Sequence, residues 1–205
     1  MIRVISYIDG FNLYFGLKSK GWRRYYWLDL VAMSESLLKD GQILEHCHYF
    51  TARVTGGSAS QSARRQTLWL DALATRQRLS IHLGHYLAKQ QQCRSCGSSW
   101  TSYEEKMTDV NIAAQLLVDG YNDRYDTALI ISGDSDLTTP ISLVRRQFPK
   151  KRVIVAFPPD RHSISLRRAA NGAFAIGEDK LRQNLLPTPI TASNGFAIHR
   201  PREWY

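Results

Sequence analysis

The sequence has 205 residues and a formal net charge of +9, a length that suits one domain and a charge that favours a polyanionic partner. Nucleic acid is the commonest such partner, and an anionic membrane surface is the alternative. No apolar stretch approaches the roughly 20 residues of a transmembrane helix, and the N-terminus leads into a predicted strand without a signal-peptide pattern. We therefore expect a cytoplasmic protein that is not embedded in a membrane. The 3 cysteines suit a reducing compartment and do not make a disulfide framework.

The first predicted element is a buried strand at residues 2–8, and a helix follows it. The strand ends in Asp9-Gly10-Phe11-Asn12, which places a carboxylate at its carboxyl end. Taken alone, Asp-Gly is a common turn and Asn12 a common helix cap. A second carboxylate at the end of a neighbouring parallel strand would instead indicate a shared ligand site.

Residues 22–89 contain a basic aromatic stretch followed by predicted helices and strands. Residues 22–27 are basic and aromatic, and their rings could stack on nucleic-acid bases or pack in the core. A helix is predicted over residues 28–39, a strand over 42–54, a small polar loop over 56–62, then a helix carrying Arg64 and Arg65, and a third strand over 79–89. We expect Arg64 and Arg65 to contribute to a basic, substrate-binding surface, although such charges are most often only solvated.

Cys93 and Cys96 flank a predicted tight turn, and two thiolates with this spacing can hold half of a tetrahedral zinc site. The other ligands could be His82 and His85, Cys47, or the same cysteine pair of a second subunit in a homo-oligomer. His82 and His85 would point to opposite faces of a regular strand, which weakens that alternative. A structural zinc ion is therefore one interpretation, and ordinary loop thiols are another. A thioredoxin-like redox pair is disfavoured, because that motif begins a helix, whereas a loop is predicted after Cys96.

A helix is predicted to open within residues 104–111. Thr108 would cap it and Asp109 would lie in its first turn, where a negative charge is favoured by the helix dipole. If this helix enters from the carboxyl edge of the sheet, it brings Asp109 toward the other acids.

The centre of the predicted chemistry is the stretch over residues 127–137. An apolar run typical of a strand buried on both faces ends there in Ser132, Gly133, Asp134 and Asp136, and a helix follows. One carboxylate is enough to cap a helix, so the second argues for a function. Ligands of open α/β sheets bind at the carboxyl ends of strands, which is where Asp9 and Asp134 are expected to meet.

The remaining elements are a strand at residues 153–157, a helix at 164–170 and a short strand at 174–176. We predict one domain over residues 1–178. Residues 179–205 lose their periodicity and are predicted to form a tail that either lies along the surface or is disordered.

Three motifs in this order resemble the NYN domain, specifically the LabA-like branch of the PIN-like nuclease superfamily: YIDGFN (residues 7–12), EKMTDV (105–110) and SGDSDL (132–137). The resemblance implies a Rossmann-like, PIN-like three-layer α/β/α fold with a mostly parallel central sheet. It also implies metal-dependent cleavage of RNA, with Asp9, Asp109, Asp134 and Asp136 as the acidic positions and Asn12 as the polar residue beside the first of them.

The residues themselves agree with this chemistry. Clustered carboxylates repel one another unless a cation neutralises them, and ligation by oxygen alone suits Mg²⁺ or Mn²⁺. Such ions can polarise a phosphate and activate water, so no protein nucleophile is needed. We expect Asp9 and Asp134 to bind metal directly, Asp109 and Asp136 directly or through water, and Asn12, Ser132 and Lys106 to position phosphate or water.

Two other functions fit parts of the same pattern. A phosphatase of the haloacid dehalogenase type needs a second Asp two residues after its nucleophile, and Phe11 stands there instead. A non-catalytic RNA-binding or assembly module that keeps the fold and the basic surface is the stronger alternative.

Overall fold

The computed structural model describes residues 1–54, 60–192 and 195–205, and most of the loop predicted over residues 56–62 lies outside them. The main sheet contains β1 (Ile2–Asp9), β2 (Gln42–Ala52), β3 (Leu79–Gln92), β4 (Ser99–Lys106), β5 (Thr127–Ile131), β6 (Arg152–Phe157) and β7 (Gly172–Ala175). The α-helices are α1 (Gly10–Ser19), α2 (Leu30–Ser36), α3 (Gln61–Leu73), α4 (Thr108–Tyr121), α5 (Thr138–Gln147), α6 (Ile164–Ala169) and α7 (Glu178–Gln183). None of the described helices is long and apolar enough to cross a bilayer.

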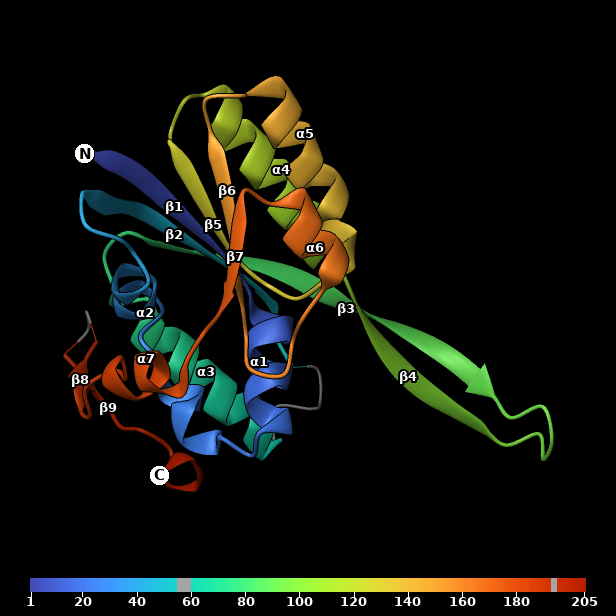
Figure 1. Cartoon of the computed structure of the whole chain (residues 1–205). Coiled ribbons are helices and arrows are strands. Elements are labelled where there is room, and N and C mark those ends of the chain that lie inside the picture. The colour runs from blue at the N-terminus through green and yellow to red at the C-terminus, as the bar shows by residue number, and fades with distance from the viewer. Residues whose placement is uncertain (55–59, 193–194) are drawn as a thin grey trace.

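The strand order is β4-β3-β2-β1-β5-β6-β7. All neighbouring pairs are parallel except β3 with β4, which are antiparallel. Helices α4, α5 and α6 cover one face of the sheet, and α1, α2, α3 and α7 cover the other (Figure 1). The predicted three-layer α/β/α fold with a mostly parallel sheet is confirmed.

The strands read as continuous apolar runs because both of their faces are buried. On β1, Val4 and Ile8 point into the core beneath α1 and α2, whereas Ile5 and Tyr7 point into the core beneath α4 and α5. This alternation pins the register of β1 against its neighbours, since a slip of one residue would exchange the two cores. The carboxyl ends of β1, β2 and β5 therefore meet at one edge.

The antiparallel arm made by β3 and β4 differs from the prediction. Residues 99–106, expected to be a loop running into a helix, form β4, and Lys106 pairs with His85 in the register. The helix begins only at Thr108, and Thr108 does not cap it, because Met107 is the cap residue and has a left-handed φ of 85°. The sharp reversal at Met107 turns the chain from the arm into α4, and the arm itself extends away from the body of the molecule (Figure 1).

The C-terminal segment after α7 lies along the surface and is not disordered in its described part. Leu186 and Trp204 are buried in the core shared with α1 and α3, and a two-stranded sheet joins β8 (Ile190–Thr191) to β9 (Ala197–Ile198). A 3₁₀ turn, η3 (Arg202–Trp204), places the Trp204 ring 5.6 Å from that of Tyr26. The segment is thus packed on the face of the sheet that carries α1.

The basic aromatic stretch forms a 3₁₀ helix, η1 (Arg23–Trp27). Tyr25 and Trp27 are almost completely buried, and Trp27 donates a hydrogen bond to the carbonyl of Pro187 in the C-terminal segment. Packing therefore accounts for these two rings, so they are not available to stack on bases.

Candidate functional site

The site begins where β1 and β5 end side by side. Ile8 of β1 pairs with Ile131 of β5. The residues that follow them, Asp9 and Ser132, therefore also lie next to one another. Ser132 Oγ donates a 2.8 Å hydrogen bond to Asp9 Oδ2, and it accepts one of 3.0 Å from the backbone N–H of Asp134. The adjacency of these two strands, which the sequence predicted, is confirmed.

Asp9 is the buried member of the site, with 2% of its surface exposed. It caps α1 by accepting a 3.0 Å bond from the backbone N–H of Asn12, whose side-chain amide also donates to Asp9 Oδ2 at 2.6 Å. The carbonyl oxygen of the same amide accepts from Gly133 N–H at 3.2 Å. Asn12 and Ser132 therefore hold the Asp9 carboxylate and tie the two strand ends together.

Gly10 is required by the close approach of α1 to β2. A Cβ at this position would lie 2.6 Å from the carbonyl oxygen of Phe50 and 2.7 Å from the hydroxyl of Tyr49, which are both too near for any side chain. The helix can start directly after Asp9 because this residue has no Cβ.

Asp134 and Asp136 lie in the turn after β5. Asp134 caps the short 3₁₀ helix η2 (Ser135–Leu137) by accepting a 3.0 Å bond from the backbone N–H of Asp136. The side chain of Asp136 is exposed.

Asp109 reaches the site from the first turn of α4. The carboxylates of Asp9, Asp109 and Asp134 each place an oxygen within 4.8 Å of the others, and Asp136 is not a member of this group. Among the residues that the structure describes, this is the one group of at least three His, Cys, Asp or Glu side chains close enough to hold a metal ion.

The electrostatics of the group favour a bound cation. Burial raises the pKa of Asp9, and the charge of Asp134 raises it further, while hydrogen bonds from Asn12 and Ser132 act in the opposite direction. A buried carboxylate next to two others is costly to ionise without a positive charge between them. Three carboxylate oxygens suit Mg²⁺ or Mn²⁺, so the residues present fit a divalent ion of this kind.

The predicted substrate-binding residues lie on two elements, β4 and α3. Lys106 is exposed at the end of β4, two residues before α4 begins. Arg64 is exposed on α3, and Arg65 on the same helix donates a 2.9 Å bond to Glu203 of the C-terminal segment. None of the three belongs to the carboxylate group.

Arg161 was missed by the sequence reasoning and lies at the same edge. Its Cβ would stand 2.8 Å from a Cβ added to Gly133, so the side chain packs directly against the turn that carries Asp134. Its Nε is buried and has no hydrogen-bond partner among the described residues. The loop after β6 that carries Arg161 gave no signal in the sequence beyond its prolines.

Cys93 and Cys96 lie at the tip of the β3–β4 arm. The backbone N–H of Gly97 donates to the carbonyl of Cys93 at 2.9 Å, closing a tight turn, and Gly97 has a left-handed φ of 74°. Hydrogen bonds from Ser98 and from the thiol of Cys93 together lower the pKa of Cys96 to about 7. Two of the suggested partners do not join them, since Cys47 is buried in the core and His82 Nε2 is 2.9 Å from His48 Nδ1.

A buried polar network lies beneath α4, on the same face as the site. Asp119 is fully buried and accepts hydrogen bonds from Tyr7 at 2.8 Å, Gln115 at 3.0 Å and Arg124 at 3.2 Å. His48 Nε2 lies 3.2 Å from Asp119 Oδ2. Burial opposes the charge of Asp119, but these contacts together hold its pKa below the ordinary value.

The histidines of this network predict acid sensitivity. Burial and the neighbouring His48 lower the pKa of His46 from 6.5 to about 4, and burial also lowers that of His82. A group whose pKa is lower in the folded state takes up protons more readily when the protein is unfolded. Its contribution to the free energy of unfolding is therefore present above pH 6.5 and is lost as the pH falls toward 4. We expect the free energy of unfolding to drop by about 1–2 kcal/mol over this range.

Urea unfolding at a series of pH values measures this dependence. His46→Gln should flatten the profile, whereas His85→Gln, which alters an exposed histidine, should leave it unchanged. A wild-type profile that is level between pH 6.5 and 4 would contradict the assignment.

Comparison with known proteins relates this chain to a family and to a curated protein. The NYN domain family matches residues 3–178. The protein 6-hydroxy-3-succinoylpyridine 3-monooxygenase HspA of Pseudomonas putida (strain DSM 28022 / S16) is 27% identical over 184 residues, which cover 70% of this chain and 56% of that protein. The chain thus spans little more than half the length of this curated relative.

A solved structure supports the fold. VPA0982, a protein of unknown function from Vibrio parahaemolyticus RIMD 2210633, superposes with a TM-score of 0.58 at 16% identity over 87% of this chain and 94% of its own. The family match spans most of the sequence and contains all the clustered acids. The chain therefore belongs to the NYN domain family of PIN-like nucleases.

Proposed function

We propose that the protein is a metal-dependent ribonuclease that hydrolyses RNA phosphodiester bonds at the carboxyl edge of its sheet. The observation that carries this proposal is the group formed by Asp9, Asp109 and Asp134, whose oxygens lie within 4.8 Å of one another in a chain of the NYN family. The net charge of +9 supports a polyanionic substrate.

In this proposal Asp9, Asp109 and Asp134 hold Mg²⁺ or Mn²⁺, and Asp136 contributes through water from its exposed position. When bound, the ion neutralises charge on the scissile phosphate and lowers the pKa of a water molecule. Asn12 and Ser132 fix the orientation of the Asp9 carboxylate through their hydrogen bonds, so they act as positioning residues.

The RNA backbone would be held by cations around this edge. Arg161 packs against the turn before Asp134, and its Nε has no partner in the part of the chain that the structure describes, which suits a contact with a phosphate oxygen. Lys106, Arg64 and Arg65 are proposed to extend this surface. Because these contacts are electrostatic, the logarithm of RNA affinity should fall linearly with the logarithm of salt concentration.

The experiment that tests the function is incubation of the purified protein with end-labelled single-stranded and hairpin RNA. Cleavage is expected with Mn²⁺ or Mg²⁺ and none with EDTA. If RNA is bound in a salt-dependent manner but never cleaved, the protein is a non-catalytic RNA-binding or assembly module that retains the NYN fold.

A second candidate function is oxidation of a small aromatic heterocycle, the activity named for the Pseudomonas relative. An aromatic cavity of about 300 Å³ next to Asp9 would accept such a ring. Against it, the first strand-to-helix turn carries the buried Asp9 where dinucleotide-binding folds bring a pyrophosphate to a glycine-rich turn, and this carboxylate would repel one. Oxygen consumption with NADH and a hydroxypyridine would reveal this activity.

We further propose that Cys93 and Cys96 bind a structural zinc ion, completed by the same pair of a second copy. The two cysteines supply half of a tetrahedral set at the tip of an extended arm, and among the described residues none of the metal-binding groups of three includes them. Reducing conditions in the cytoplasm, where we place the protein, would keep both as thiols.

Elemental analysis and light scattering test the zinc proposal. Protein never exposed to chelator should contain about half an equivalent of zinc per chain and run as a dimer, because one tetrahedral site needs both pairs. Cys93→Ser with Cys96→Ser should abolish both, whereas Cys47→Ser should leave the zinc content unchanged. Less than a tenth of an equivalent of zinc in the wild type would leave the pair as ordinary loop thiols.

A further inference from the structure

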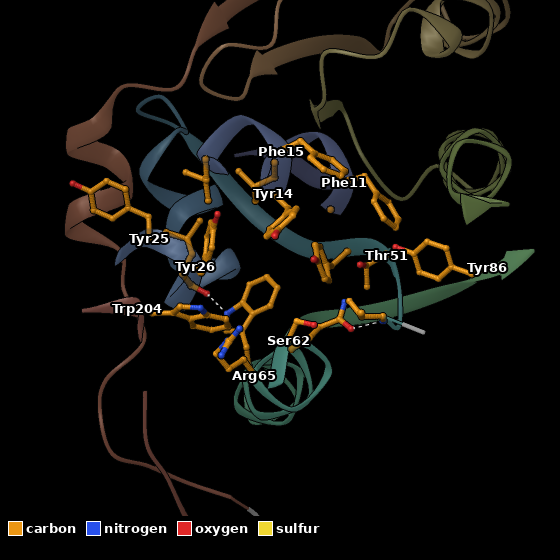
Figure 2. Close-up of a pocket in the computed structure, with 18 residues that line it drawn as sticks. Phe11, Tyr14, Phe15, Tyr25, Tyr26, Thr51, Ser62, Arg65, Tyr86 and Trp204 are labelled. Carbon is orange, nitrogen blue, oxygen red and sulfur yellow. Dashed lines mark hydrogen bonds between the residues drawn. The ribbon is translucent and has the colours of Figure 1, made fainter. Parts of the chain in front are cut away.

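A cavity of about 300 Å³ opens beside the acidic edge on the α1 face of the sheet. It lies between α1, η1, the end of β2 and α3, and Trp204 of the C-terminal segment forms part of its wall (Figure 2). Its volume is at the lower end of the range for small-molecule sites, which suits one planar ring system rather than a large cofactor.

The walls of the cavity are mostly aromatic. The ring centroids of Tyr14 and Tyr26 are 5.2 Å apart, and those of Trp69 and Tyr49 are 5.5 Å apart. Phe11 and Tyr86 form the side of the cavity away from Trp204, at 6.1 Å from one another (Figure 2). Flat rings arranged around an open volume favour a flat, polarisable ligand.

The polar atoms of the wall already have partners within the protein. Trp69 Nε1 donates to the carbonyl of Leu28 at 3.0 Å, and both ends of the Gln66 amide are bonded to backbone atoms of Val54 and Ala52. Arg65 is paired with Glu203. A ligand would therefore be held by stacking and shape, with little reading of its hydrogen-bonding edge.

The cavity adjoins the acidic site along the chain. Gly10 and Phe11 line it and directly follow Asp9. On its rim Phe15 is 42% exposed, with Lys18 Nζ 5.6 Å and Arg161 Cζ 5.9 Å from its ring centroid. Arg161 thus lies against both the cavity rim at Phe15 and the turn before Asp134.

We propose that this cavity binds one nucleobase of the RNA strand, next to the phosphate at the carboxylates, with Arg161 holding the intervening backbone. This inference rests on the proposed ribonuclease function. Stacking on several rings tolerates every base, so the pocket would fix the position of the cut relative to the strand without selecting a sequence.

An abasic scan tests the pocket separately from catalysis. A set of single-stranded RNA oligonucleotides, each lacking the base at one position, is titrated against Asp134→Asn protein in EDTA, so that no hydrolysis is needed for a signal. Affinity should fall about tenfold when the missing base is the one that enters the cavity and change little elsewhere.

Two variants close or open the cavity without touching the carboxylates. Ser62→Trp, at an exposed position of α3 on the cavity wall, should occupy the space, and Tyr14→Ala should remove one stacking surface. Both should weaken binding of the intact oligonucleotide about tenfold. In both, the dip in the scan, which is the loss of affinity at one abasic position, should disappear. Tyr121→Ala, which removes an 83% exposed ring at the end of α4, is the matched control and should behave as the parent protein.

Arg161→Ala distinguishes the phosphate contact from the base contact. It should weaken the binding of intact and abasic oligonucleotides by the same factor. It should also reduce the slope of the logarithm of affinity against the logarithm of salt concentration. A level abasic scan, or equal binding by the Ser62→Trp and parent proteins, would overturn the base pocket.

Free adenine and a hydroxypyridine serve as arms of the same titration. If either free ring binds as tightly as the oligonucleotide and the scan is level, the cavity holds a small heterocycle and the proposal is wrong. A clear dip in the scan together with absent RNA cleavage by the wild type would leave the base pocket standing while the hydrolytic function fails.

Discussion

Asp134→Asn is expected to lower the rate of metal-dependent RNA cleavage at least about 100-fold while the protein stays folded. The substitution removes one of three clustered negative charges that would hold the ion. Asparagine keeps an oxygen that can accept the 3.0 Å bond from Asp136 N–H, so the start of η2 should persist. RNA binding in EDTA should be unchanged or slightly tighter, because a carboxylate that repels phosphate has gone.

The matched control is Asp40→Asn, which makes the same change at an exposed position just before β2, at the amino edge of the sheet. It should cleave as the wild type does, in the same divalent-ion titration and with the same circular dichroism spectrum. Equal rates for Asp134→Asn and wild-type protein would mean that the activity belongs to a contaminant or that the acids are not the site.

The carboxylate site could be predicted because its residues follow from topology. Asp9 comes directly after an apolar run, and Asp134 comes three residues after the end of another. Parallel strands deliver such residues to one edge, and the two carboxylates meet there. Asp109 was placed correctly in the first turn of its helix, although Thr108 does not cap it. Asp136 was predicted with the others, yet it follows Asp134 by two residues in a tight turn and its side chain is exposed.

What could not be predicted depends on contacts between distant segments. Among the described strands β4 pairs only with β3, in an extended arm. Its polar and charged sequence therefore lacks the apolar pattern by which buried strands are found. Trp204 lies in a segment without periodicity, and its burial depends on contacts with the distant η1, α1 and α3. Arg161 can lie at the site because Gly133, 28 positions away in sequence, has no Cβ and leaves room for it.

The polar network around Asp119 could not be predicted from the sequence either, because a single acid late in an amphipathic helix is usually solvated. In the fold this side chain is fully buried between Tyr7 and Arg124, and it joins α4 to β1 and β2. The same helix carries Asp109 at its other end, so the network fixes the helix that presents this carboxylate. The stability of the network and the geometry of the site are therefore connected through α4.

Asp119→Ala is expected to lower the free energy of unfolding by about 3–5 kcal/mol, since it leaves the Tyr7 hydroxyl and His48 buried without their anionic partner. Urea unfolding followed by tryptophan fluorescence measures this change. Asp71→Ala, at an exposed position of α3, is the matched control and should cost no more than about 0.5 kcal/mol.

A double-mutant cycle with Tyr7→Phe isolates the contact itself. Alone, Tyr7→Phe should cost about 1–2 kcal/mol, because it removes a 2.8 Å hydrogen bond to a buried carboxylate. In the Asp119→Ala background, which removes the acceptor, the same substitution should cost much less. If alanine prevents folding, Asp119→Asn replaces it; its amide oxygen is a neutral acceptor, so there the cost of Tyr7→Phe should fall by about half. If the two effects add without coupling, or if Asp119→Ala costs less than about 1 kcal/mol, then Asp119 does not organise this face of the sheet, and α4 is held by its apolar contacts through Ile112 and Leu116 alone.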